Sequence, residues 1–214
     1  MFARPNSQHC QVAYVTNDLV AAMALMKAEY DAPGFFELTN IQPGEDPAGR
    51  PVLKVALTVV GGVEIELIEP VGDTAPLFRD VLPGGDALAI RFHHVATRIT
   101  GPVENWEAHL ASLDLARHPV VFEGSVGEML RYIYTDERHT VGHFVEHVWM
   151  SDELLGQMAA VVPSYPPPRT LADDCSAFPS QFPRRGRPAM RRRADRATGH
   201  PVPFGRARQL PRRA

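Results

Sequence analysis

The stretch QVAYV at residues 11–15 returns 83 residues later as HVATR at residues 94–98. Each is an apolar, strand-like segment that begins with a polar side chain. A second pair keeps nearly the same spacing, because Glu66 and Glu146 lie 80 residues apart, each in an otherwise apolar segment. The two offsets predict a duplicated structural unit, since one copy alone could not bury its sheet face.

The segments around these anchors have the same order in both halves. The first half predicts a strand at 11–15, a helix at 19–30 and strands at 35–39, 52–60 and 63–68, ended by Pro70. The second half predicts a strand at 94–98, a helix at 103–115 and strands at 119–123, 129–135 and 143–150. The sequence therefore predicts an α+β fold made of two βαβββ modules, at 8–70 and 90–150.

The chain continues past these modules with a change in composition. Residues 151–162 predict a last helix. Residues 163–214 carry twelve Arg, three Asp and half of the prolines, whereas the preceding part is acidic. Such a basic, Pro/Arg-rich stretch has too few periodic apolar residues to fold, so we expect a disordered, solvated tail. It lacks aromatic interleaving and nucleic-acid motifs, and we expect no nucleic-acid partner.

The overall composition is that of a soluble globular protein. The 214 residues are 44% hydrophobic and 22% charged, with a net charge of −3. No stretch approaches the roughly 18 apolar residues of a membrane helix, and the N-terminal residues do not resemble a secretory signal. Cys10 and Cys175 are interpreted as free thiols in a reducing compartment. We therefore expect a cytoplasmic protein that does not interact with membranes.

Four polar residues lie within strands that are otherwise apolar: Gln11, Glu66, His94 and Glu146. A carboxylate on a largely apolar face costs several kcal/mol unless it is paired or binds a metal ion. Two carboxylates at equivalent points of a repeat indicate a common partner between the modules. A divalent cation satisfies two carboxylates, an imidazole and an amide oxygen together, and leaves positions for water or substrate oxygens.

Structural interpretations of the same residues remain open at this point. A glutamate in a strand is commonly on the wet face of an antiparallel sheet. The pair His93-His94 could be one core and one surface histidine. Three more histidines lie near Glu146, namely His139, His143 and His147. Alternation along the strand places His143 and His147 on the face opposite to Glu146, which disfavours them as ligands.

Four segments together resemble the vicinal oxygen chelate superfamily, which includes glyoxalase I, epimerases, extradiol dioxygenases and bleomycin-resistance proteins. They are QVAYVTNDLVAAMALM, GGVEIELIEP, HHVATRI and GHFVEHVWM, in the order typical of that family. The resemblance covers about residues 8–150. It implies a curled mixed sheet around a cleft, a small-molecule substrate and a homodimer.

The resemblance also implies a set of site residues. The family's metal ligands correspond to Gln11, Glu66, His94 and Glu146, the set seen in the zinc-type glyoxalase I. The implied cofactor is a divalent metal ion, Zn or Ni, Co, Mn or Fe. Glu146 is the implied catalytic base and Glu66 has that role on the opposite face of the substrate, while Gln11 and His94 stay bound to the metal. The arginines that hold glutathione in glyoxalase I are absent, since Val15 and Ile90 stand at those positions.

The sequence thus predicts a metal-dependent lyase or isomerase of the glyoxalase type, which transfers a proton next to a metal-chelated carbonyl. The alternatives are an epimerase or other isomerase of an acyl or ketone substrate, and a metal-free small-ligand-binding protein on the same scaffold. Four apolar residues are candidates for the pocket lining, although such residues are more often core: Phe92, Met129, Phe144 and Trp149.

Overall fold

Two modules with the same order of strands and one helix make up most of the molecule in the computed structural model, which describes residues 6–42, 51–73 and 75–166. Module one contains β1 (Ser7–Thr16), α1 (Leu19–Glu29), β2 (Phe36–Ile41), β3 (Val52–Val60) and β4 (Val63–Val71). Module two contains β5 (Ile90–Ile99), α3 (Val103–Ala111), β6 (Val120–Val126), β7 (Leu130–Asp136) and β8 (Phe144–Met150). The predicted α+β fold is confirmed.

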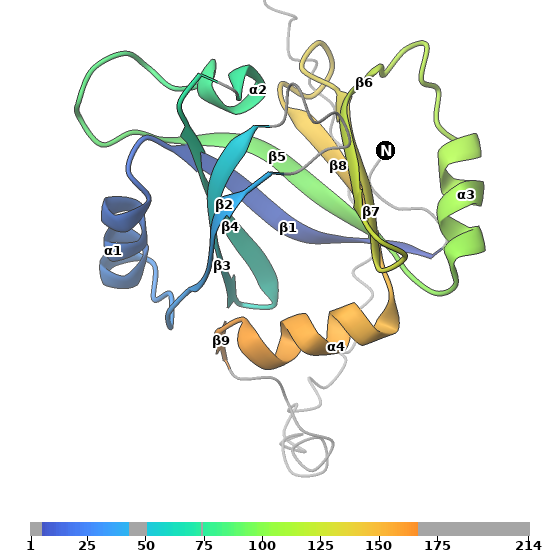
Figure 1. The fold of residues 1–214 in the computed structure, drawn as a ribbon, viewed down its shortest axis with the longest axis horizontal. Helices are drawn as coiled ribbons and strands as arrows, with labels where there is room; N and C mark the ends of the chain where they lie inside the picture. Colours follow the sequence, from blue (N-terminus) through green and yellow to red (C-terminus); the bar gives the residue numbers. More distant parts are fainter. Residues whose placement is uncertain (1–5, 43–50, 74, 167–214) are drawn as a thin grey trace, which may run out of the picture. The chain divides into compact units, whose positions relative to one another are not determined.

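A single sheet joins the two modules (Figure 1). The strand order is β2-β3-β4-β1-β5-β8-β7-β6, with β9 (Ser164–Tyr165) added beside β3. Within each module the first strand pairs in parallel with the last one, β1 with β4 and β5 with β8. The modules meet where β1 and β5 run antiparallel. The two modules that form the sheet therefore belong to the same chain.

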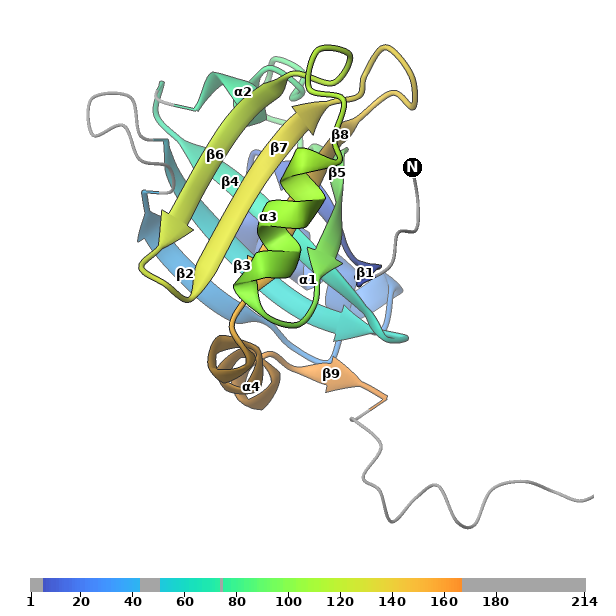
Figure 2. The ribbon, with the colours of Figure 1, turned by 90° about the vertical axis from the view of Figure 1, so that its right-hand side faces the viewer.

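The sheet curls so that one face is concave and the other carries the helices of the modules (Figures 1 and 2). Apolar residues of both modules fill the concave face, including Val15, Leu57 and Ile68 from module one and Tyr134 and Phe144 from module two. On the convex face, α1 packs on β3 and β4, and α3 packs on the second module. A short helix between the modules, α2 (Pro76–Arg79), places Phe78 in the concave core.

The helix ends have local causes. The Asp18 side chain accepts a hydrogen bond from the backbone N–H of Ala21 and so begins α1. Helix α3 ends at Ala111, whereas the sequence predicted a helix to Leu115. Ser112 bonds back to the His109 carbonyl through both its hydroxyl and its N–H, which closes the last turn early.

Two predicted boundaries were wrong. Strand β4 continues through Pro70 to Val71, because its parallel pairing with β1 ends at Ile68 and the missing N–H costs nothing there. The tail predicted from residue 163 instead begins with β9, whose Ser164 pairs with Val59 of β3. The remaining predicted tail, 167–214, lies outside the described residues.

The segment after β8 forms α4 (Asp152–Val161), for which the sequence predicted a helix over 151–162. It is capped by the Ser151 hydroxyl, which accepts a hydrogen bond from the N–H of Leu154. No helix within the described ranges is long and apolar enough to cross a membrane. Cys10 is a buried free thiol, and Cys175 lies outside those ranges.

Candidate metal centre

Strand register brings the matched polar residues to the middle of the concave face. One row across the four central strands runs from β4 to β8 through Glu66, Ala13, His94 and Phe144. The next row runs through Glu64, Gln11, Ala96 and Glu146. Neighbours in a row point to the same face of a sheet. The duplicated pattern therefore places both glutamates beside His94.

The three side chains approach each other closely. His94 Nε2 lies 3.5 Å from Glu66 Oε2 and 3.4 Å from Glu146 Oε2. His94 is fully buried, and the side chains of Glu66 and Glu146 are 14% and 12% exposed. Glu66 Oε2 is buried and meets no hydrogen-bond criterion among the described residues, so its long ion-pair contact with His94 is the interaction that compensates its burial there. A buried carboxylate oxygen held by one long contact has room to accept a further ligand.

A chain of hydrogen bonds fixes which nitrogen of His94 faces the glutamates. His93 Nε2 is 3.1 Å from the Leu77 carbonyl, which can only accept, so this nitrogen donates. Burial, and next the charge of His94, lowers the pKa of His93 to about 3, so its ring is neutral and its Nδ1 is an acceptor. His94 Nδ1 lies 2.8 Å away and is therefore the donor. His94 thus presents Nε2 to both carboxylates.

Burial and the neighbouring charges have opposing effects on the pKa values of the cluster. Burial acts to lower the pKa of His94, but the adjacent Glu146 and Glu66 outweigh it and raise the pKa to about 9. Burial raises the pKa of Glu66, an effect that His94 opposes. The Tyr134 hydroxyl is 3.4 Å from His94 Nε2, and burial together with both carboxylates raises its pKa well above the usual value. Tyr134 therefore keeps its proton and stays a potential donor.

Carboxylate oxygens and an imidazole nitrogen are atom types that bind divalent metal ions. Ligand atoms that lie about 2.1 Å from a tetrahedral metal ion are roughly 3.4 Å from one another, close to the separations around His94 Nε2. As placed within residues 6–42, 51–73 and 75–166, no group of three His, Cys, Asp or Glu side chains could hold a metal ion. Binding a metal ion here therefore requires Glu66 and Glu146 to turn toward a common point.

Gln11 lies on the same face but in the next row, between Glu64 and Ala96. It is 8% exposed. Along β1 it lies two residues from Ala13, which is paired with His94. Glu64 is a second carboxylate in this row. Burial, and next the charge of Glu66, raises the pKa of Glu64 to about 7. The structure thus gathers Glu66, His94 and Glu146, with Gln11 adjacent to them.

Of the candidates for the pocket lining, Phe144 alone faces this cluster. Its ring packs against His93, with centroids 4.9 Å apart. Trp149 is instead buried on the convex face with Trp106, and Phe92 lies against Tyr14 with 43% of its surface exposed. Met129 is an exposed turn residue before β7. The expectation was wrong for Trp149 because strand alternation points it to the other face, and for Phe92 because a β-bulge at His93 reverses the alternation.

His109 and His147 lie on the convex face, under α3. His147 Nδ1 is 2.9 Å from His109 Nε2, and His147 Nε2 is 3.2 Å from the Thr135 hydroxyl. His139 stacks on His118, and His143 bonds to the Phe144 carbonyl. A polar cavity of about 470 Å³ under α3 includes His109 and His147. These contacts make His147 a structural residue, as alternation predicted.

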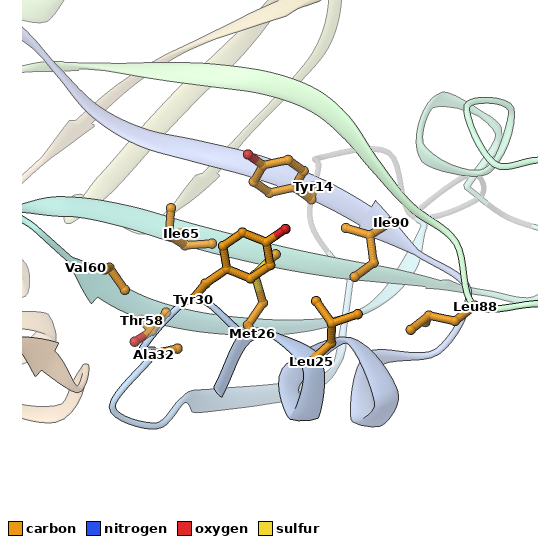
Figure 3. A pocket seen from close by; sticks show the side chains of 10 residues that line it. All are labelled: Tyr14, Leu25, Met26, Tyr30, Ala32, Thr58, Val60, Ile65, Leu88 and Ile90. Atoms are coloured by element: carbon orange, nitrogen blue, oxygen red, sulfur yellow. The ribbon is translucent and has the colours of Figure 1, made fainter. Parts of the chain in front are cut away.

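Module one has the corresponding cavity under α1, with a volume of about 530 Å³ (Figure 3). It is mostly apolar and lies between α1 and the convex face of the sheet. Tyr14, Met26, Tyr30 and Ile65 are among its lining residues. No titratable pair comparable to Glu66 and Glu146 lines it among the described residues, so it does not compete as the site of chemistry.

Sequence reasoning missed three residues of the concave face: His93, Tyr134 and Arg98. A β-bulge at His93 turns both neighbouring histidines inward, and a bulge leaves no clear sequence signal. Tyr134 pairs in register with Glu146, and Arg98 lies four residues beyond His94 on β5. Alternation and strand pairing could have found these two.

Comparisons with known proteins give similarity in structure alone. No family model matches the chain, and no curated protein matches it. Methylmalonyl-CoA epimerase from Mycobacterium tuberculosis is 15% identical, over 73% of this chain and 97% of that one, with a TM-score of 0.48. A hypothetical protein, BH1468 from Bacillus halodurans C-125, is 12% identical, over 68% and 96%, with a TM-score of 0.46.

A third similar structure is methylmalonyl-CoA epimerase from Streptomyces coelicolor in complex with 2-nitronate-propionyl-CoA. It is 18% identical, over 67% of this chain and 94% of that one, with a TM-score of 0.45. Identities this low do not assign a function, so the case for one depends on this chain's own site.

Proposed function

We propose that the protein is a metal-dependent lyase or isomerase of the glyoxalase type, which moves a proton next to the carbonyl group of a small substrate. The observation that carries this proposal is the approach of Glu66 and Glu146, one from each module, to the same nitrogen of His94. Two carboxylates on either side of one point can remove and return a proton on opposite faces of a substrate.

The chain supplies most of the chemistry. Glu66, His94, Glu146 and Gln11 would hold a divalent ion such as Zn, Ni, Co, Mn or Fe, which acts as a Lewis acid toward two neighbouring substrate oxygens. Glu146 takes the proton beside the carbonyl, and Glu66 has the same role on the other face. Gln11 and His94 would stay bound to the ion and hold it in place.

The residues around the cluster support this role. His93 holds the His94 ring in place through their 2.8 Å hydrogen bond. Tyr134, which keeps its proton, can donate to oxygen as negative charge develops there. Buried apolar neighbours such as Phe144 limit access of water, which strengthens these interactions.

The test begins with the metal content of the purified full-length chain. We expect one divalent ion per chain, measured by elemental analysis, and loss of turnover after chelation that is restored by added metal. Activity on the methylglyoxal–glutathione hemithioacetal would identify the lyase reaction. Incorporation of deuterium from D2O into methylmalonyl-CoA, without activity on the hemithioacetal, would identify the epimerase alternative instead.

A metal-free binding protein is the second candidate, and one observation favours it. With a pKa near 9, His94 carries a proton at neutral pH, and this imidazolium can form an ion pair with both glutamates. In that case a proton occupies the point proposed for the metal. Absence of bound metal after incubation with each of the five ions would support this candidate and contradict the enzyme.

The homodimer remains a prediction. Both modules of the site come from one chain, so the site does not need a second copy. Light scattering of the full-length protein would give the oligomeric state independently of activity.

A further inference from the structure

Arg98 is a cationic residue on the concave face that the cluster does not use. It lies on β5 two residues beyond Ala96, which is in register with Glu146. Residues two apart on a strand point to the same face and are separated by about 7 Å. Arg98 is therefore close enough to the cluster of Glu66, His94 and Glu146 for one small molecule to contact both.

A cavity of about 480 Å³ opens beside Arg98. It lies between the β3–β4 hairpin and α4, the helix drawn in orange below the sheet in Figure 1. Glu64 and Arg98 are the charged residues that line it, whereas Met158 and Val162 give it an apolar wall. Its volume is typical of sites for small ligands.

One nitrogen of the Arg98 guanidinium, Nε, is buried without a hydrogen bond among the described residues. No carboxylate in that part lies within 4.0 Å of Arg98, and this includes Glu64 across the same cavity. A buried guanidinium donor is costly when unpaired, and its planar fork matches a carboxylate through two parallel hydrogen bonds.

We propose that Arg98 binds a carboxylate group of the substrate, so that the substrate is a small carbonyl compound that also carries a carboxylate. This inference rests on the proposed function, because the carbonyl end of the substrate is the part held at Glu66, His94 and Glu146. The carboxylate end lies in the cavity under α4. Arg98 would then set both the orientation and the class of the substrate.

The test uses two probes that share a 2-oxo acid end and differ at the other end. 2-Oxoglutarate has a second carboxylate there, and 2-oxopentanoate has a methyl group. Calorimetry on the full-length protein, zinc-loaded and chelator-treated, gives the Kd of each. We expect 2-oxoglutarate to bind at least about tenfold more tightly, as a charged hydrogen-bonded pair would give.

Variants connect this preference to Arg98. Arg98→Met should bring the ratio of the two Kd values close to one without changing the Kd of 2-oxopentanoate, and Arg98→Lys should keep part of the ratio. Arg131→Met is the matched control, because Arg131 is a strand arginine paired with Glu128 away from this cavity. Equal binding of both probes to the wild-type protein, or an unchanged ratio in Arg98→Met, would overturn the proposal.

The same measurements separate this inference from the proposed function. A ratio that depends on Arg98 in both protein forms, without any gain from zinc, would keep the carboxylate site and contradict the metal centre. A gain from zinc for both probes with a ratio near one would keep the metal centre and overturn the role of Arg98.

Discussion

The two modules agree where they face each other and differ where each faces its own helix. On the concave face, Glu66 and Glu146 occupy equivalent strand positions and approach the same nitrogen. One residue further along the same strands, on the convex face, Leu67 corresponds to His147. The cavity under α1 is accordingly apolar, and the cavity under α3 is polar.

This contrast separates two kinds of buried polar residue. His147 has partners at both ring nitrogens, His109 and the Thr135 hydroxyl, so its burial is compensated within the fold. In the described part of the chain, Glu66 Oε2 has a long ion-pair contact with His94 Nε2 at 3.5 Å but no hydrogen bond. A buried polar group with complete hydrogen bonds stabilises the fold, whereas one with a single long contact leaves room for a ligand.

The largest expected effect is on turnover. Glu146→Gln removes the proposed base but keeps the shape of the side chain, so we expect kcat to fall about 10²–10⁴-fold. The measurement is steady-state kinetics with whichever substrate the assays above identify. His147→Gln changes the next residue of β8, which points to the convex face; it is the control and should keep a kcat close to wild type. Equal losses in both variants would remove the distinction between the two faces.

The second-largest expected effect is on metal affinity, which should depend on residues of the concave face and not on those of the convex face. His94→Ala removes a proposed ligand, and we expect the affinity for Zn to fall at least about 100-fold, more than for loss of an outer partner. Competition with a chromophoric chelator measures it. His109→Ala serves as the control from the convex face. Unchanged Zn affinity in His94→Ala would exclude that residue as a ligand.

For the stability of the metal-free protein, we expect substitutions on the convex face to have larger effects than substitutions in the concave cluster. His147→Ala removes the hydrogen bonds that join His147 to His109 and to the Thr135 hydroxyl, and we expect the free energy of unfolding to fall by about 1–3 kcal/mol. Glu66→Gln removes a buried charge and should cost less than this or stabilise the protein. Urea unfolding of chelator-treated samples gives both values. A greater loss in Glu66→Gln would show that this glutamate is a structural residue.

The smallest effect concerns how the two convex helices begin. Asp18 caps α1 through its side chain, whereas Pro102, the residue before α3, forms no side-chain cap. We expect Asp18→Ala to lower the free energy of unfolding by about 1 kcal/mol. Thermal unfolding detects this change. Val20→Ala, at a 73% exposed position of the same turn, should have little effect, and a comparable loss there would argue against capping as the cause.

The features that repeat could be predicted from the sequence. The 83- and 80-residue offsets predicted the two modules. Strand alternation predicted that His147 lies on the face of the sheet opposite to Glu146. These predictions depend on local periodicity and on a comparison within the chain. They need no knowledge of how the strands are finally paired.

The features that depend on pairing could not be predicted in this way. The bulge that turns His93 inward is a shift of register between β1 and β5. The partner of its Nε2 is a carbonyl on α2, at Leu77. The facing of Phe92 depends on the same bulge, since it reverses alternation along β5. The roles of such residues follow from long-range contacts that sequence periodicity does not contain.

The antiparallel seam between β1 and β5 has a practical consequence for any assay. Because that seam lies within one polypeptide, the cluster around His94 is assembled by folding and not by association of subunits. Specific activity should then stay constant when the protein is diluted to nanomolar concentration, even under conditions in which a dimer would dissociate.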